Sequence, residues 1–415
     1  MANKRIYLCL AHMSGKEQAF IQEAFDTNWV VPLGPNVNGF EADIEAFCGQ
    51  NKRVVALSSG TAAVHLALIA CGVGPGDEVC VQSFTFCASS HPITYLGATP
   101  VFIDSEKDTW NMNPDLLEEA IKDRIAKTGK KPKAIVPVAL YGMPYKIDRI
   151  MEIAHKYDIP VVEDAAEGFG SKFNGQVLGT FGKYGVLSFN GNKMITTSGG
   201  GALITNNENE WREIMMYATQ YRESYPYYQH EKIGYNYRMS NICAGIGRGQ
   251  MTILDEHIKH HKHVQKLYEE LLKDVPGIKV HSQPATGEYD SNYWLCTITI
   301  DEDIKIKGQE NAYKTVVKGA VGGAAGVIHI ADSATTDCQP NDNIEALRVF
   351  MDTAGIEARP VWKPMHKQPV YKDAPAYVNG VSEAVFKVGM CLPAGPYVSD
   401  EDVKYIVETI KKAIP

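Results

Sequence analysis

Short apolar runs alternate with amphipathic segments through the first 250 residues of the chain. The apolar runs have the length of buried strands, and the segments between them carry the period of helices. Strands are predicted at 54–57, 78–81, 99–103, 134–140 and 160–163, and helices at 62–70, 114–126 and 147–157. This alternation predicts an α/β fold with a mostly parallel sheet and helices on both of its faces.

The pattern changes after about residue 250. A long polar helix is predicted over 250–272, an alternating strand over 292–300, and further helices over 343–354 and 400–413. We therefore expect a large α/β domain over residues 1–250 and a smaller α+β domain over residues 251–415. Residues 319–342 are rich in Gly, Ala, Ser and Thr and low in charge, and their pattern predicts no element.

Composition excludes several classes of protein. The 415 residues are 45% hydrophobic and 22% charged, so the chain can bury a large core and is not disordered. A net charge of −8 argues against a broad nucleic-acid-binding surface but leaves room for a local pocket that binds a small anion. The uncharged stretches 54–76 and 79–103 are interrupted by polar and turn-forming residues, so we expect no membrane span.

The cysteines and the N-terminus bear on the compartment. Nine cysteines form no Cys-x-x-Cys pair, and the first residues lack the apolar core of a signal peptide. Scattered thiols of this kind are typical of reducing compartments. We expect a cytoplasmic protein.

A candidate anion site lies between the first strand and the helix that follows it. The segment Ser-Ser-Gly-Thr-Ala-Ala spans residues 58–63. Free N–H groups at a helix start bind phosphate, Gly60 allows close approach of the backbone, and Thr61 adds a hydroxyl. An ordinary Ser/Thr helix cap is the alternative interpretation.

Asp164 and Lys193 are the two candidate reactive groups. Asp164 ends a buried strand, where α/β proteins place their ligands, although it could simply cap the next helix. Lys193 follows an apolar run and precedes the triple glycine 199–201. A lysine in such a pocket can lose its proton and form a Schiff base, although most lysines are solvated surface charges.

Together these three sites match the needs of pyridoxal phosphate. The phosphate would bind at the helix start, Lys193 would form the Schiff base, and Asp164 would keep the pyridine nitrogen protonated. Phe86 follows a strand and could cover the ring face, or could belong to the core.

Specific segments of the chain resemble the DegT/DnrJ/StrS sugar aminotransferases, of the aspartate aminotransferase fold (type I). Ser-Phe-Asn-Gly-Asn-Lys (188–193) and Gly-Tyr-Asn-Tyr-Arg-Met (234–239) are the most specific. The second of these, together with 357–366, is most similar to the branch that aminates C4 of UDP-linked 4-keto-6-deoxy sugars, including bacillosamine-type enzymes. The resemblance covers nearly the whole chain except about 304–342, which is longer than usual in this family and puts the sugar in doubt.

The resemblance implies roles for the matching residues. Lys193 would be the Schiff-base lysine and proton shuttle, and Glu167 would face the cofactor ring. Asn236 would reach the phosphate of the neighbouring subunit in a homodimer with shared active sites. The phosphate ligands implied are Thr61, Ala62 and Ser188, close to Gly60. Arg238, Trp362 and His366 are substrate-side candidates, each with a structural role as the alternative.

The implied reaction is a transamination in two halves. L-glutamate would give its amino group to the cofactor, leaving pyridoxamine phosphate, which would aminate a nucleotide-linked keto sugar. A C3 aminotransferase acting on a 3-keto sugar would share every cofactor residue and is the main alternative. A sugar dehydratase would have His in place of Lys193, and a non-catalytic regulatory relative would be expected to lose Lys193 or Asp164.

Two other motifs carry less chemistry. His257, His260, His261 and His263 form a cluster. Of these, His257 and His261 could share a helix face as metal ligands do, but no carboxylate or cysteine is well placed beside them and lysines are interleaved. We predict a solvated helix face and no metal site. Glycines 199–201 precede a strand-like run instead of a helix, so they are not a dinucleotide-binding fingerprint.

Overall fold

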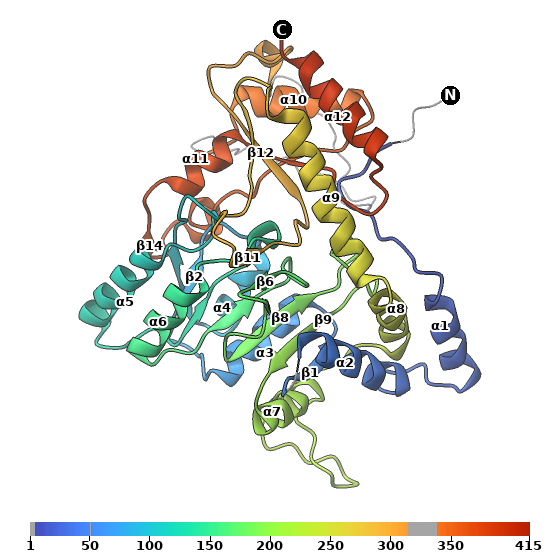
Figure 1. Ribbon diagram of the computed structural model, residues 1–415. Coiled ribbons are helices and arrows are strands. Elements are labelled where there is room, and N and C mark those ends of the chain that lie inside the picture. The colour runs from blue at the N-terminus through green and yellow to red at the C-terminus, as the bar shows by residue number, and fades with distance from the viewer. Residues whose placement is uncertain (1–4, 50, 314–337) are drawn as a thin grey trace.

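The computed structural model describes residues 5–49, 51–313 and 338–415 (Figure 1). Most of the segment 319–342, for which the sequence predicts no element, lies outside these ranges. Among the described residues, no helix is long and apolar enough to cross a membrane.

A mostly parallel sheet forms the centre of the larger part, as predicted. Two four-stranded groups meet where β4 and β5 are joined by parallel bridges, Ile135 to Val161 and Val138 to Asp164. Only β9 runs against its neighbours. In spatial order the strands are β14 (Ala376–Tyr377), β3 (Thr99–Ile103), β2 (Glu78–Gln82), β4 (Ala134–Val136), β5 (Val162–Asp164), β8 (Tyr184–Ser188), β9 (Gly201–Thr205) and β1 (Arg53–Leu57).

Both faces of this sheet are buried. In β1, Val54 and Ala56 pack into one core cluster, whereas Val55 and Leu57 pack into another on the opposite face. This is the two-residue period of a strand covered on both sides. The helices of this part are α1 (Glu17–Asp26), α2 (Pro35–Cys48), α3 (Gly60–Ala70), α4 (His91–Tyr95), α5 (Pro114–Thr128), α6 (Ile147–Tyr157), α7 (Glu208–Ala218) and α8 (Asn241–Met251).

A second core lies in the C-terminal part of the chain. It is built on an antiparallel sheet in the order β10 (Ile278–Val280), β12 (Cys296–Ile300), β15 (Gly389–Leu392) and β13 (Arg359–Pro360). The surrounding helices are α9 (Leu254–Leu272), α10 (Asp342–Thr353), α11 (Val381–Val388) and α12 (Asp400–Ala413). Ile6, near the N-terminus, pairs with Ile356 and joins this core. The chain therefore passes between the two parts more than once.

A short hairpin sheet connects the two parts. Its strands are β6 (Lys172–Phe173), β7 (Gln176–Val177) and β11 (Tyr289–Asp290), in the order β11-β6-β7. Figure 1 shows α9 running from the larger sheet towards α10 and α12. Its first residues contribute to the core of the larger part, and Val264, Tyr268 and Leu272 contribute to the second core.

Three predicted elements differ most from the structure. The strand predicted over 134–140 ends at Val136, because Pro137 has no N–H group to extend the ladder and Tyr141 has a φ of +54°. The strand predicted over 292–300 starts only at Cys296. The helix predicted over 250–272 starts only at Leu254, as α9, because the chain turns at residues 252–253 and residues 250–251 end a separate helix, α8.

The glycines of α8 explain why the sequence pattern did not predict this helix. Glycine is a poor helix former, so a segment with Gly245, Gly247 and Gly249 does not predict one. A Cβ atom at Gly247 would lie 2.7 Å from the ring of Phe40, and one at Gly249 would lie 2.7 Å from the side chain of Glu17. The small residues let α8 pack closely against α1 and α2.

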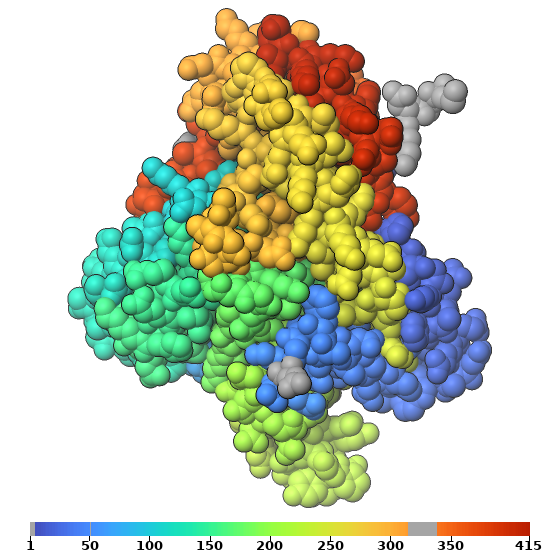
Figure 2. Space-filling view, in the orientation of Figure 1, coloured from blue at the N-terminus to red at the C-terminus, as the bar shows by residue number. Residues whose placement is uncertain are grey.

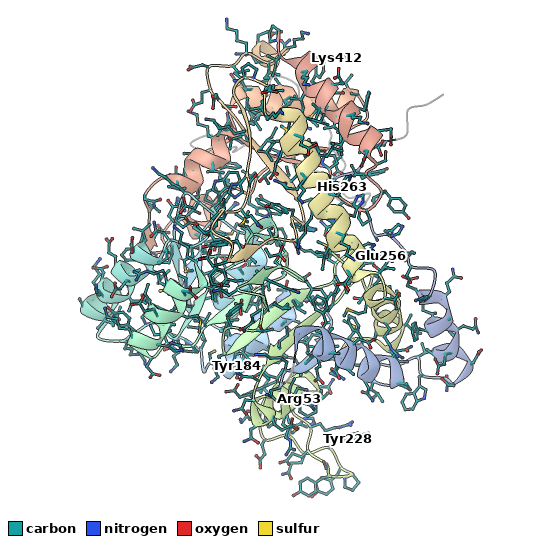
Figure 3. All side chains as sticks on the ribbon, in the orientation of Figure 1. Arg53, Tyr184, Tyr228, Glu256, His263 and Lys412 are labelled. Atoms are coloured by element: carbon teal, nitrogen blue, oxygen red, sulfur yellow. The ribbon has the colours of Figure 1, made fainter. Side chains whose placement is uncertain are left out.

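The predicted solvated histidine face is wrong for two of its members. His257 and His261 are buried on α9, and their Nδ1–H groups donate to the carbonyl oxygens of Met194 (3.0 Å) and Tyr293 (3.2 Å). Only His263 of the four is exposed on the outer face, where it pairs with Asp400 (Figure 3). These histidines face inward because they lie on the face of α9 that packs against the two cores, whereas the opposite face is exposed.

We expect acid to destabilise the protein partly through His261. Burial lowers the pKa of His261 to about 3, so below about pH 6.5 the unfolded chain binds a proton that the folded chain does not. Stability therefore falls as the pH falls through this window, by about 2 kcal/mol at pH 5 from this group. His261→Asn keeps a donor for Tyr293 and does not titrate, so its free energy of unfolding should depend less on pH between 7 and 5.

Urea unfolding at the two pH values measures this difference. His263→Asn, at an exposed position of the same helix, is the control and should keep the pH dependence of the unchanged protein. An equal pH dependence in His261→Asn and His263→Asn would contradict the assignment.

Candidate active site

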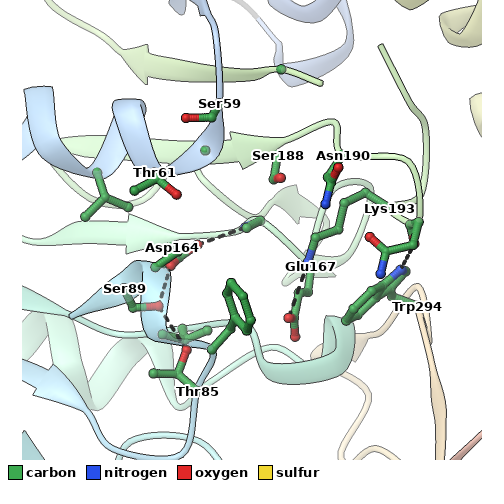
Figure 4. Close-up of a pocket in the computed structure, with 18 of the residues that line it drawn as sticks. Ser59, Thr61, Thr85, Ser89, Asp164, Glu167, Ser188, Asn190, Lys193 and Trp294 are labelled. Atoms are coloured by element: carbon green, nitrogen blue, oxygen red, sulfur yellow. Dashed lines mark hydrogen bonds and ion pairs between the residues drawn. The ribbon is translucent and has the colours of Figure 1, made fainter. Parts of the chain in front are cut away.

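A cavity of about 330 Å³ lies at the carboxyl ends of the central strands (Figure 4). Its walls come from the start of α3, the turn after β2, the ends of β5 and β8, and the loop that carries Lys193. Eight of the predicted site residues line it: Gly60, Thr61, Phe86, Asp164, Glu167, Ser188, Lys193 and Trp362. The sheet topology has brought together residues that lie more than 300 positions apart.

The start of α3 faces the cavity and could form a cradle that holds an anion. Gly60 and Thr61 occupy the first helical positions, whose N–H groups have no acceptor within the helix. Ser59 caps the helix, because its Oγ accepts the N–H of Ala62 at 3.0 Å. Ala62 does not line the cavity, so Ser59 takes the amide that we expected a phosphate to use. The cap is therefore formed, and it leaves the N–H groups of Gly60 and Thr61 without an acceptor within the helix.

A second strand makes this cradle possible. Gly201, the first residue of β9, lies so close to α3 that a Cβ atom there would be 2.4 Å from the backbone N of Gly60. Across the cradle, Ser188 ends β8 and lines the same cavity. The third glycine of the 199–201 run is therefore required by packing against the helix start.

Asp164 is buried and held by neutral donors. Its Oδ2 accepts the Ser89 hydroxyl at 2.6 Å, and its Oδ1 accepts the N–H of Ala166 at 3.1 Å. Burial raises the pKa of Asp164, while these two donors and the charge of Lys193 act to lower it. Ser89 bonds in turn to Thr85 at 2.9 Å. A carboxylate fixed in this way can receive a proton or pair with a cation in the cavity.

Lys193 and Glu167 face each other on the opposite side of the cavity. The Nζ atom of Lys193 lies 3.4 Å from Oε1 of Glu167 and 4.0 Å from the ring centroid of Trp294. Burial raises the pKa of Glu167, and Lys193 acts to lower it. The other oxygen of Glu167 accepts the N–H of Tyr141 at 2.7 Å. The amine thus lies between a carboxylate and an aromatic face, shielded from water.

Aromatic rings form part of the wall of the cavity. The rings of Phe86 and Trp362 lie 5.4 Å apart, and Trp362 stacks on Tyr141 at 6.0 Å. The side chain of Phe86 is 51% exposed, unlike a core phenylalanine, and it lines the cavity. The structure therefore places Phe86 outside the core, which was its alternative reading.

Three predicted site residues lie away from the cavity. Arg238 is buried against Glu41 (2.5 Å) and the carbonyl of Ala56 (3.0 Å), and His366 links Ser83 (2.6 Å) to Glu383 (3.1 Å). Neither lines the cavity, so their geometry favours the structural alternative over substrate contact. Asn236 is exposed in the connection between α7 and α8 and does not line the cavity of its own chain.

The sequence missed several lining residues. Ser89 and Thr85 sit in a turn without a distinctive motif, and Trp294 comes from a segment that we read only as a strand. Asn190 and Asn192, inside the Ser-Phe-Asn-Gly-Asn-Lys segment, also line the cavity. For these two, proximity to Lys193 was an available signal, whereas Ser89 and Trp294 reach the site only through the fold.

A family model covers almost the whole chain. The DegT/DnrJ/EryC1/StrS aminotransferase family matches residues 12–325 and 326–411. The chain belongs to this family. This match confirms the family and the fold class predicted from the sequence. Its family makes the protein a sugar aminotransferase.

Individual relatives agree over nearly their full length. The chain is 41% identical to EpsN of Bacillus subtilis (strain 168), over 98% of this chain and 95% of that protein. It is 33% identical to the GDP-perosamine synthase of Escherichia coli O157:H7, over 96% of each. It is 29% identical to the UDP-2-acetamido-2-deoxy-3-oxo-D-glucuronate aminotransferase of Pseudomonas aeruginosa, over 90% of this chain and 89% of the relative.

A solved structure shows the same fold. Spr1654 from Streptococcus pneumoniae, in its PMP form, superposes with a TM-score of 0.82 at 25% identity, over 99% of this chain and 97% of that chain. Family and structural neighbours support dependence on pyridoxal phosphate. The cavity of this chain fits that group, because it combines free helix-start amides, a buried carboxylate opposite them and a shielded lysine.

We expect Gly201→Ala to damage the cradle. The added methyl group would meet the backbone of Ser59 and Gly60 at 2.4 Å, so the start of α3 must shift. Affinity for pyridoxal phosphate, measured by equilibrium titration, should fall at least about tenfold, the effect of losing one or two good hydrogen bonds.

Gly191→Ala is the matched control. A Cβ atom at Gly191 meets nothing within 4 Å, and Gly191 does not line the cavity. This variant should bind the cofactor as the unchanged protein does. Equal affinities in the two variants would show that the approach of β9 to α3 does not shape the site.

Proposed function

We propose that this aminotransferase moves the amino group of L-glutamate to the 4-keto group of a UDP-linked 4-keto-6-deoxy sugar, using pyridoxal phosphate. The observation that carries the proposal is the position of Lys193 and Asp164 in one cavity with the phosphate cradle at the start of α3. The sugar assignment draws on the resemblance of segments 234–239 and 357–366 to C4 aminotransferases.

Each end of the cofactor has residues to hold it. The amides of Gly60 and Thr61 and the hydroxyl of Ser188 would take the phosphate. Asp164 would hold the protonated ring nitrogen, and Phe86 would cover the ring. Lys193 would hold the cofactor covalently. When bound, pyridoxal phosphate supplies an electron sink for a carbanion formed on the amino donor.

Lys193 is the proposed general acid and base. Its Nζ would accept the proton from Cα of L-glutamate, and would later deliver a proton to the sugar carbon that becomes aminated. Glu167, 3.4 Å away, can stabilise the ammonium form between these events. Trp294 and Trp362 line the same cavity and limit the access of water to the amine.

The complete site is proposed to need two subunits. Asn236 is exposed and does not line the cavity of its own chain, which is consistent with a role towards the phosphate site of a second copy. The loop between α7 and α8, which carries Tyr228, projects from the body of the molecule (Figures 2 and 3). Exposed Tyr227, Tyr228 and Ile233 on this loop offer apolar surface for contact between copies.

The first test is an absorbance spectrum of the protein loaded with pyridoxal phosphate. We expect a band at about 410–430 nm that L-glutamate converts to one near about 330 nm. Lys193→Ala should lose the band and at least about 10⁴-fold in activity, because it removes both the covalent link and the proton carrier. Lys183→Ala, at a lysine paired with Glu210 outside the cavity, should behave as the unchanged protein.

The second test identifies the keto sugar. Once L-glutamate has removed the band at about 410–430 nm, a UDP-linked 4-keto-6-deoxy sugar should restore it. The GDP-linked analogue should restore the band more slowly. Restoration by a 3-keto nucleotide sugar alone would instead support C3 amination, the alternative favoured by similarity to the Pseudomonas aeruginosa relative. Failure of every nucleotide sugar, with the glutamate step intact, would overturn the sugar assignment and leave the cofactor chemistry standing.

A further inference from the structure

The backbone on each side of Lys193 is held by a ring N–H group. The indole Nε1–H of Trp294 donates to the carbonyl of Asn192 at 2.6 Å. The imidazole Nδ1–H of His257 donates to the carbonyl of Met194 at 3.0 Å. The two acceptors are the residues immediately before and after the lysine. Trp294 and His257 are almost fully buried, at 1% and 4% exposure, so both donors are shielded from competing water.

Hydrogen bonding selects one arrangement of protons on His257. A carbonyl oxygen can only accept, so Nδ1 must carry the proton that reaches Met194. Neutral His257 then presents Nε2 as an acceptor, and Nδ1 of His12 donates to it at 3.1 Å. Burial lowers the pKa of His257, which favours this neutral form. The imidazole therefore has a partner for each nitrogen and a defined orientation.

The loop around Lys193 depends on such contacts. Residues 190–200 contain no helix or strand. Within the loop, the N–H of Lys193 donates to Asn190 and that of Thr197 donates to Phe189, both at 3.0 Å. Neither bond fixes the carbonyls that flank the lysine. Those carbonyls are reached from outside the loop, by α9 and by the segment before β12.

We propose that His257 and Trp294 are positioning residues that clamp the carbonyls of Met194 and Asn192 and so orient the side chain of Lys193. We refer to these two hydrogen bonds as the ring clamp. α9 and β12 both continue into the second core, so the clamp ties the position of the lysine to the smaller part of the molecule. This inference rests on the proposed role of Lys193.

Two substitutions of His257 separate its two nitrogens. The side-chain amide nitrogen of Asn can take the place of Nδ1 and keep the bond to Met194. Gln reaches the place of Nε2 instead, so His257→Gln keeps a polar contact towards His12 and loses the clamp. Both replace the ring with a smaller polar group, so a general packing effect would appear in both variants.

Hydrogen exchange on the cofactor-free protein is the first readout. Amides in the peptide covering 190–197 should exchange about tenfold faster in His257→Gln than in the unchanged protein, and nearly normally in His257→Asn. His263→Asn, on the exposed face of α9, should leave this peptide unchanged. Equal exchange in His257→Gln and His257→Asn would overturn the proposal.

Capture of pyridoxal phosphate by Lys193 is the second readout. The rate at which the band near about 420 nm appears should fall about tenfold in His257→Gln and recover in His257→Asn. Trp294→Phe keeps an aromatic ring near Lys193 but loses the Nε1–H donor together with the rest of the pyrrole ring, so it should slow capture similarly. It also keeps the proposal testable if His257→Gln fails to fold. Normal capture in Trp294→Phe would contradict the clamp.

The two readouts distinguish the inference from the proposed function. If the unchanged protein formed no absorbance band, the role of Lys193 would fail, while hydrogen exchange would still decide whether the clamp exists. If the unchanged protein captured the cofactor and His257→Gln did so equally fast, the clamp would fail and the proposed function would stand.

Discussion

The burial of Asp164, Glu167 and Lys193 in one cavity is the constraint around which this fold is arranged. A buried carboxylate is costly unless hydrogen bonds and opposite charge offset its lost hydration. Asp164 accepts hydrogen bonds from the Ser89 hydroxyl and the Ala166 N–H group. Glu167 accepts a hydrogen bond from the Tyr141 N–H group and pairs with the amine of Lys193. Each donor comes from a different strand end or turn. The two carboxylates are therefore stabilised only where these strand ends converge on one cavity.

The smaller part of the molecule completes this site. Trp294 and Trp362 come from the C-terminal third of the chain, and they form the wall that faces Lys193 and Phe86. α9 passes from one core to the other and carries His257 to the carbonyl beside the lysine. Motion of the smaller part would therefore reach the lysine through hydrogen bonds to its backbone, as well as by opening or closing the cavity.

Substrate choice depends on groups that the cofactor chemistry does not need. Arg238 is neutralised by Glu41 and His366 bridges Ser83 and Glu383, so both are satisfied within the chain. Family members named for different nucleotide sugars share this scaffold, which fits a conserved reaction with variable recognition.

The sequence by itself determined the strand and helix order, the candidate phosphate cradle, Asp164 and Lys193, because each depends on local pattern and on where parallel strands end. Tertiary structure decided the rest. Ser89 and Trp294 enter the site by contacts across 75 and 101 residues of chain, which no local pattern encodes. The glycine-rich α8 is a helix despite its low intrinsic helix propensity, because it packs against α1 and α2 at positions where larger side chains would clash. The sequence predicts that His257 and His261 are solvated, but they are buried because their face of α9 packs against both cores, a contact that only the tertiary structure defines.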